Sequence, residues 1–170
     1  MGHSNRPLAD FLAMLRAHGI KLLVDVRTHP GSRAVPWANP EPLAQALAQE
    51  GIRYLHIPAL GGRRKPLPGS VNTAWRNEQF RGYADHMATP EFKQGLEQLL
   101  ERAAAAPTAV MCAEAVPWRC HRSLLADALV AQGVEVVQAI DSAHAAPHKV
   151  TPFARIRGGQ VTYPAERPLA

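Results

Sequence analysis

The stretch TAVMCAEAVPWRCHRSLLADALVAQG, residues 108–133, decides the fold class of this chain. Its first part, Thr108–Ala113, is a short apolar run of the kind that forms a buried strand, and a polar loop containing Pro117 follows. The next part, His121–Gln132, has the apolar spacing of a helix, and Gly133 closes it. A strand followed directly by a helix predicts one unit of an alternating α/β fold.

The same alternation runs through most of the chain. Strands are predicted at residues 20–26, 52–57, 108–113 and 134–140. Helices are predicted from a cap at Ser4 or Asn5 to Gly19, from Asn39-Pro40 to Gly51, around 78–87, from Thr89-Pro90 to the alanines before Pro107, and over 121–132. Four strands alternating with helices predict a three-layer, Rossmann-like domain with a mostly parallel sheet flanked by helices. Gly158 and Gly159 separate two short β-type runs and predict a C-terminal edge hairpin over 154–163.

Length and composition bound the class of protein. With 170 residues, 46% of them hydrophobic, the chain is long enough for one core and short for two, so we expect a single domain over residues 1–170. No apolar run approaches the roughly 18–20 residues that span a bilayer, and the start lacks a secretion signal. We therefore expect a cytoplasmic protein with no membrane partner. The formal net charge of +5 favours an anionic partner, such as a phosphate, a nucleotide or a nucleic acid.

Polar residues follow three of the predicted strands. Asp25, Arg27 and His29 end the first strand, His56 ends the second, and Cys112 and Glu114 end the third. In open α/β sheets the ligand crevice lies beyond the carboxyl ends of the strands. We therefore expect these side chains to form one site at one edge of the sheet.

The starts of two helices add residues to this edge. They are His3 and Ser4 before the first helix, and Cys120, His121 and Arg122 at the helix that follows the third strand. Backbone N–H groups at a helix start favour an anion and lower the pKa of a thiol such as Cys120. Arg119 or Arg122 can hold the same anion with two hydrogen bonds.

Each candidate residue has a chemical and a structural interpretation. Cys112 or Cys120 can serve as a nucleophile or a redox thiol, and Glu114 and His121 can move protons if burial raises the pKa of Glu114. Alternatively, Asp25 only pairs with Arg27, His56 is a wall residue, and Cys112 belongs to the core. For Trp118 we favour packing over stacking on a ligand ring. The gathering of these residue types at one edge favours a site.

Known spacings restrict the chemistry. A thiol phosphatase loop places arginine six positions after cysteine, whereas Arg119 is the seventh residue after Cys112. The zinc deaminase spacing is also missing from the sequence. A metal site remains open in which Cys112, Cys120 and His121 are joined by a fourth ligand from His3, Asp25 or His56, although C-x7-C-H is not a standard zinc spacing.

Five stretches together resemble the DUF488 family, a bacterial family of unknown function. They are GHSN (2–5), DVR (25–27), LGGRRK (60–65), FRGYADHM (80–87) and CAEAVPWRCHR (112–122), and the resemblance extends from Gly2 to about Pro164. It implies a compact α/β domain and a C-x-E-x2-P-x2-C-H-R signature, carried here by Cys112, Glu114, Pro117, Cys120, His121 and Arg122. Members of the family usually begin with a short apolar strand before GHS, whereas Met1 directly precedes Gly2 here. We therefore expect either an earlier chain start or an exposed sheet edge.

Three functional hypotheses follow. The leading one is an enzyme that binds a phosphate- or nucleotide-like anion at the carboxyl edge of the sheet and acts through the cysteine, glutamate and arginine side chains. The second is a nucleic-acid-binding module without catalysis, in which the basic loop Gly61–Arg81 tracks a backbone while Trp75, Phe80 and Tyr83 stack on bases. The third is a metalloprotein that uses Cys112, Cys120 and His121.

Overall fold

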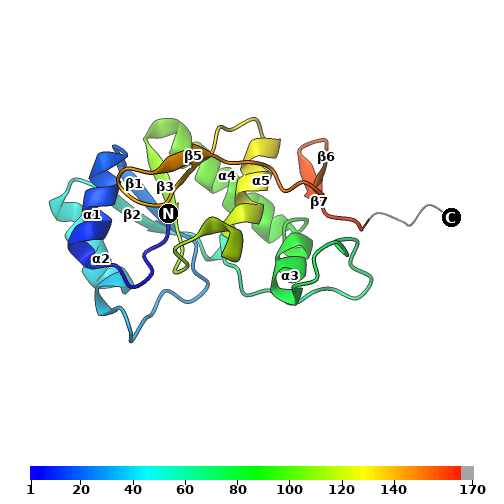
Figure 1. The fold of residues 1–170 in the computed structure, drawn as a ribbon, viewed down its shortest axis with the longest axis horizontal. Helices are drawn as coiled ribbons and strands as arrows, with labels where there is room; N and C mark the ends of the chain where they lie inside the picture. Colours follow the sequence, from blue (N-terminus) through cyan, green and yellow to red (C-terminus); the bar gives the residue numbers. More distant parts are fainter. Residues whose placement is uncertain (166–170) are drawn as a thin grey trace.

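A computed structural model describes residues 1–165 and shows a mixed α/β fold (Figure 1). Its central sheet has three parallel strands, β1 (Leu22–Asp25), β2 (Arg53–His56) and β3 (Thr108–Met111), in the order β2-β1-β3. The α-helices of the described residues are α1 (Leu8–Ala17), α2 (Pro40–Gln49), α3 (Glu78–His86), α4 (Pro90–Ala105) and α5 (Arg122–Ala131). No helix within this part of the chain has the length and apolar character to cross a membrane. The expected domain limit at residue 170 lies outside the described residues.

The register of the sheet places the carboxyl ends of its strands side by side. Asp25, the last residue of β1, lies opposite His56 of β2 on one side and Met111 of β3 on the other. The residues that follow the strands, including Arg27 and Cys112, therefore emerge at one edge, as the sequence predicts.

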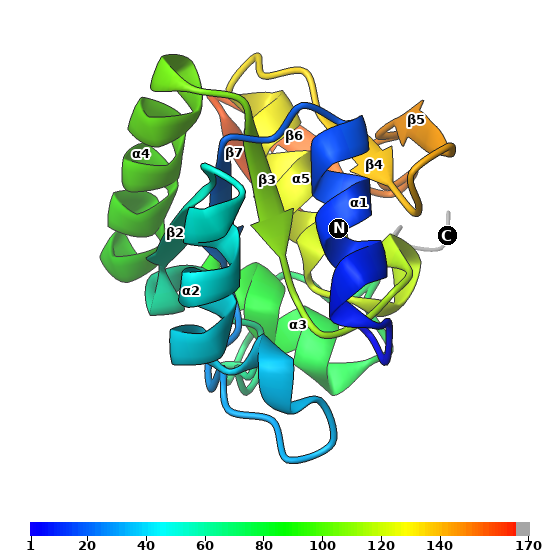
Figure 2. The same ribbon diagram turned by 90° about the vertical axis from the view of Figure 1, so that its left-hand side faces the viewer.

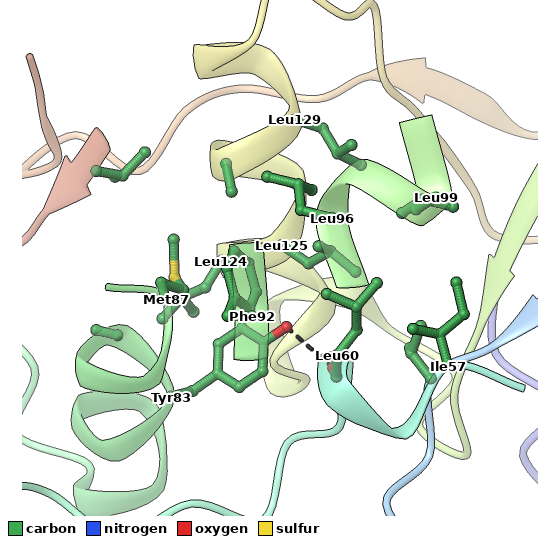
Figure 3. Close-up of a cluster of buried hydrophobic side chains, with 14 of the residues drawn as sticks. Ile57, Leu60, Tyr83, Met87, Phe92, Leu96, Leu99, Leu124, Leu125 and Leu129 are labelled. Carbon is green, nitrogen blue, oxygen red and sulfur yellow. Dashed lines mark hydrogen bonds between the residues drawn. The ribbon is translucent and has the colours of Figure 1, made fainter. Parts of the chain in front are cut away.

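Helices cover both faces of this sheet and bury two apolar clusters. Figure 2 shows α1 and α2 in front of the sheet, where the cluster comprises Phe11, Met14, Leu15, Leu23, Leu43, Leu47, Ile52, Ala109 and Met111. Behind the sheet, α3, α4 and α5 surround the larger cluster, which includes Ile57, Leu60, Tyr83, Met87, Phe92, Leu96, Leu99, Leu124, Leu125 and Leu129 (Figure 3). Side chains alternate across a strand, so Leu23 faces the first cluster and Val24 the second. Burial on both faces explains why the first three residues of β1, before Asp25, are all apolar.

The starts of the helices are only partly as expected. Thr89 caps α4 through its hydroxyl, which accepts a hydrogen bond from the backbone N–H of Phe92. The cap expected at Ser4 or Asn5 is wrong, because α1 begins after Pro7 without a side-chain cap. Ser4 instead has a φ of 48°, and its backbone N–H donates to the carbonyl of Ala113 at 2.8 Å.

The predicted fourth parallel strand is also wrong. Residues 137–139 form β4 (Val137–Ala139), which pairs antiparallel with β5 (Ala145–Pro147) in a separate two-stranded sheet. The physical reason lies at the outer edge of β3, where the chain start takes the pairing positions: Gly2 bridges in parallel to Cys112. In addition, the N–H of His3 donates to the carbonyl of Cys112 at 3.1 Å.

The C-terminal hairpin is confirmed. It consists of β6 (Arg155–Arg157) and β7 (Gln160–Thr162), and the intervening Gly158 and Gly159 have φ values of 56° and 76°. Such positive φ angles suit glycine and the tight turn of a hairpin. Its expected position at the edge of the main sheet is wrong, because the two strands pair only with each other within the described residues.

Candidate functional site

A cavity of about 240 Å³ lies at the carboxyl edge of the sheet. Six predicted site residues line it: Arg27, Cys112, Glu114, Arg119, Cys120 and His121. The connection after β1 leads through α2 on one face of the sheet, whereas the connection after the neighbouring β3 leads into α5 on the other face. Such a divergence opens a crevice between the two strands. The cavity is therefore located where the topology of the sheet favours a ligand site.

The segment between β3 and α5 brings the two cysteines to this cavity. Cys112 directly follows β3, and Cys120 directly follows the short 3-10 helix η3 (Pro117–Arg119). The proline fixes the first residue of this turn, and the N–H of Cys120 donates to the carbonyl of Pro117 at 3.0 Å. The turn directs the chain back toward the end of β3, which brings together thiols that are eight positions apart.

The two thiols and one imidazole form a tight cluster. The Sγ atoms of Cys112 and Cys120 and a ring nitrogen of His121 all lie within 4.8 Å of one another. His121 Nδ1 is 3.6 Å from Cys120 Sγ, and Arg122 Nε donates to the same sulfur at 3.3 Å. His121 Nε2 is buried and has no hydrogen-bond partner within the described residues. Cys120 is therefore the sulfur with the positively charged donor.

The two thiols have opposite acidities because they interact with each other. A hydrogen bond from the Cys112 thiol, followed by hydrogen bonding to His121 and the charges of His121 and Arg122, lowers the pKa of Cys120 although burial opposes the shift. The hydrogen bond with Cys120 and burial raise the pKa of Cys112. The lowered pKa of Cys120 and the raised pKa of Cys112 make Cys120 the sulfur of the pair that carries the negative charge.

Asp25 positions a neighbouring arginine and does not line the cavity itself. It is completely buried, and its carboxylate accepts hydrogen bonds from the backbone N–H, Nε and Nη2 of Arg27 at 3.0, 2.9 and 2.6 Å. The hydroxyl of Tyr54 donates to the same carboxylate at 2.7 Å. The paired interpretation of Asp25 is therefore confirmed, and the pair holds Arg27 at the cavity wall.

Four further predicted residues lie beside the cavity without lining it. His56 Nε2 is 2.7 Å from the carbonyl of Arg27, and His3 Nε2 is 3.3 Å from Arg27 Nη1. Arg122 lies behind Cys120 and donates through Nη2 to the carbonyl of Glu114. Ser4 is engaged through its backbone with the loop after β3. In the part of the chain that the structure describes, neither His3, Asp25 nor His56 joins the cluster of the cysteines and His121 as a fourth ligand.

Two side chains are more exposed than the buried positions considered for them. The side chain of Glu114 is 53% exposed, with Oε2 4.0 Å from Arg119 Nε, so Glu114 is not a buried acid. Trp118 is 65% exposed on η3 instead of packed. Both residues belong to a short loop that projects beyond the sheet edge, where few neighbours can cover them.

Several lining residues were not predicted. They are Thr28, Gly62, Arg63, Gln79, Phe80 and Ala113, whereas His29, which was expected at the end of the first strand, also lines the cavity. Gly62 permits the closest approach, because a Cβ atom at this position would lie 2.2 Å from His121 Nδ1. The signal in the sequence was the pair of glycines before a basic run, which is typical of a backbone that approaches another group closely.

The aromatic residues expected to stack on bases have other roles. Tyr83 is completely buried, and its hydroxyl donates to the carbonyl of Leu60 at 3.0 Å (Figure 3). Trp75 packs edge-on against Phe80, Phe153 and Tyr163, at centroid distances of 5.0, 4.9 and 5.6 Å. The expectation is wrong for Tyr83, which no base can reach.

Comparison with known proteins identifies a family. A family model described as "Domain of unknown function DUF488" matches residues 7–129. This match is shorter than the expected span from Gly2 to Pro164, and it leaves out the GHSN stretch. No curated protein and no solved structure matches the chain.

Proposed function

Because this chain belongs to the DUF488 family, whose function is unknown, we propose from the site itself that it is an enzyme acting on a small anionic ligand. The ligand is phosphate-like or carries another compact negative group, and it binds at the carboxyl edge of the sheet. Cys120 reacts with it as a thiolate nucleophile. The observation that carries the proposal is the position of Arg122 Nε and His121 Nδ1, at 3.3 and 3.6 Å from Cys120 Sγ.

The donors around Cys120 suit a nucleophile better than an inert core thiol. A buried thiol in apolar surroundings keeps its proton and is unreactive, whereas a neighbouring cation stabilises the thiolate. Cys120 is 4% exposed, yet its side chain lines the cavity, so a ligand inside the cavity can reach it. Burial of Cys120 therefore does not separate it from the cavity.

The charge of the cavity supports an anionic ligand. Three arginines line it, Arg27, Arg63 and Arg119, against the single carboxylate of Glu114. Guanidinium groups bind phosphates and carboxylates through paired hydrogen bonds. The volume of about 240 Å³ is below the range of most ligand pockets, which favours a small molecule or one end of a larger one.

Proton transfer has two candidate groups. The His121 ring is close enough to take the proton of the Cys120 thiol, because its Nδ1 is 3.6 Å from the sulfur. Glu114 lies at the cavity wall with half of its side chain exposed, where it can exchange protons with solvent. This assignment gives the imidazole the inner position and the carboxylate the outer one.

The metal and nucleic-acid hypotheses have less support. A divalent ion at the two sulfurs would have to displace Arg122 from Cys120 and would lie among arginines. The nucleic-acid hypothesis retains its basic loop but loses Tyr83 as a stacking residue. We rank both below the thiolate enzyme.

A pair of alkylating agents tests the proposal. Iodoacetate is an anion and iodoacetamide is its neutral analogue, so the ratio of their rates at Cys120 reports the field inside the cavity. We expect the ratio of the iodoacetate rate to the iodoacetamide rate to be about tenfold higher at Cys120 than at a free cysteine, because a basic cleft concentrates anions. Inorganic phosphate should protect Cys120 competitively. A ratio equal to that of free cysteine, without protection by phosphate, would refute the proposal.

Matched arginine variants locate the effect. Arg63→Gln and Arg119→Gln should each lower the iodoacetate preference, because both side chains line the cavity. Arg102→Gln removes the same charge from the exposed last turn of α4, at the opposite edge of the sheet, and should leave the preference unchanged.

Elemental analysis of protein purified under reducing conditions tests the metal hypothesis. One metal ion per chain in the wild type, lost in Cys120→Ser, would show that the site is a metal centre and would refute the thiolate mechanism.

A further inference from the structure

The second thiol, Cys112, has no task in a reaction that uses Cys120 alone. The chain contains only two cysteines, and both line the same cavity of about 240 Å³. Their Sγ atoms lie within 4.8 Å of each other, whereas a disulfide holds its sulfurs about 2.05 Å apart. A shift of less than about 3 Å would therefore join them.

We propose that the two thiols act as a pair, with Cys120 attacking a small anionic disulfide and Cys112 resolving the mixed disulfide that forms. This inference rests on the proposed function and names its substrate class: a disulfide that carries carboxylate or phosphate groups. The chain would then be a thiol–disulfide oxidoreductase. An acyl- or phosphoryl-transfer enzyme would need a water molecule, and not a second thiol, beside the nucleophile.

The first half of the reaction is a simple exchange. The Cys120 thiolate attacks one sulfur of the disulfide RS–SR, a bond forms between Cys120 Sγ and that sulfur, and the S–S bond of the substrate breaks. The second sulfur leaves as the thiolate RS⁻, and the proton that the His121 ring took from the Cys120 thiol passes to this leaving group or to solvent, so the ring is free for the second half. Arg119 and Arg63 at the cavity wall are placed to stabilise the negative charge of the substrate and of this leaving group.

The second half uses Cys112. Once Cys120 Sγ is bound to the substrate sulfur, the Cys112 thiol passes its proton to the His121 ring, whose nitrogen belongs to the same 4.8 Å cluster. Cys112 Sγ then attacks Cys120 Sγ, the Cys112–Cys120 disulfide forms, and the second RS⁻ leaves and takes up the proton. Overall, the dithiol is oxidised by two electrons and RSSR is reduced to two thiols. An external thiol reductant must restore the dithiol for the next turnover.

The surroundings of the pair favour this chemistry over a metal centre. Arg122 donates to Cys120 Sγ, and Arg27, itself buried and held by Asp25, lines the same cavity. Positive groups stabilise a thiolate and an anionic leaving group, whereas they repel a divalent cation. The position of Cys112 at the end of β3, half-buried and next to the cavity, leaves it accessible to the mixed disulfide.

Dithionitrobenzoate, an aromatic disulfide with a carboxylate on each ring, is the probe. Reduced wild-type protein should release two coloured nitrothiobenzoate ions per chain, and the intact mass should show an internal disulfide with no nitrobenzoate attached. Two thiols that react independently would also release two ions per chain, but both sulfurs would keep an attached group. That second result would overturn the inference, and it needs no variant.

Variants assign the order of attack. Cys112→Ser should release one ion quickly and retain one nitrobenzoate on Cys120 as a stable mixed disulfide. In Cys120→Ser, the remaining Cys112 should react at least about tenfold more slowly than Cys120 does, because the guanidinium of Arg122 donates its hydrogen bond to Cys120 Sγ and not to Cys112. A faster reaction at Cys112 than at Cys120 would overturn the assigned order.

A neutral probe separates the two proposals. Hydroxyethyl disulfide should also oxidise the pair to the internal disulfide, although more slowly than the anionic probe. If Cys120 prefers anionic reagents but no internal disulfide forms, the anion-binding enzyme stands and the dithiol mechanism fails. Each rate is divided by the rate of free cysteine with the same probe, because the two leaving thiols differ in acidity. If the internal disulfide forms with equal normalised rates for both probes, the dithiol mechanism stands and the anion site fails.

Discussion

Replacing Cys120 by serine should change how the stability of the protein depends on pH. An unfolded thiol has a pKa of about 8.5, so at neutral pH the unfolded chain carries a proton on Cys120. In the folded chain the hydrogen bond from Cys112, together with His121 and Arg122, lowers the pKa of Cys120, so the thiolate persists below neutral pH. The unfolded state therefore binds one more proton at this position than the folded state does.

The sign and size of the effect follow from proton linkage. A lowered folded-state pKa stabilises the fold fully above the unfolded pKa, and this contribution is lost as the pH falls toward the folded pKa. One proton of difference corresponds to about 1.4 kcal/mol of unfolding free energy per pH unit. The stability of wild type relative to Cys120→Ser should therefore rise by about 2.7 kcal/mol between about pH 5.5 and about pH 7.5. Above about pH 8.5 the stability of wild type relative to Cys120→Ser should fall again. The pKa of Cys112 is raised in the folded chain, so folded Cys112 keeps a proton that the unfolded chain loses.

Urea unfolding under reducing conditions measures this difference. The difference between the two proteins removes the contribution of the eight histidines, which titrate in the same range. Cys112→Ser is the control, because a serine hydroxyl can still donate to the Cys120 thiolate and should preserve the slope. A difference between wild type and Cys120→Ser that does not change with pH would show that Cys120 is protonated in the fold, and the nucleophile assignment would fail.

Two other substitutions test the structure of the site. Asp25→Asn should lower the unfolding free energy by about 3–5 kcal/mol, because the buried Arg27 loses its counter-charge; a loss below about 1 kcal/mol in urea unfolding would contradict the role of the pair. Gly62→Ala should cost about 1–3 kcal/mol and slow the alkylation of Cys120, since the new Cβ would lie 2.2 Å from His121 Nδ1. Gly31→Ala, with no atom within 4 Å of its Cβ, is the matched control and should be neutral in both measurements.

Local patterns were sufficient for most of the helices and strands. The apolar run before Asp25 corresponds to β1, and Thr89-Pro90 does begin α4. These predictions succeeded because apolar periodicity and capping residues act over a few neighbouring positions. The fourth parallel strand failed because residues 137–139 had to compete with the distant chain start for the edge of β3, and Gly2 holds part of that edge.

The same distinction applies to the site. The sequence by itself determined that Cys112, Cys120 and His121 belong to the loop between a strand and a helix, and that this loop lies at the carboxyl edge of a parallel sheet. Both follow from local segments and from the common direction of parallel strands.

Only the tertiary structure decided which side chains meet in the cavity. Arg63 reaches it from a loop about fifty positions before Cys112, and Glu114 lines it with a side chain that is still 53% exposed. Gly62 leaves room for the His121 ring because it has no side chain. No local sequence pattern specifies this close approach between two distant segments. The physical reason is that burial, side-chain direction and close approach depend on packing between segments far apart in the chain, and only the folded arrangement brings those segments together.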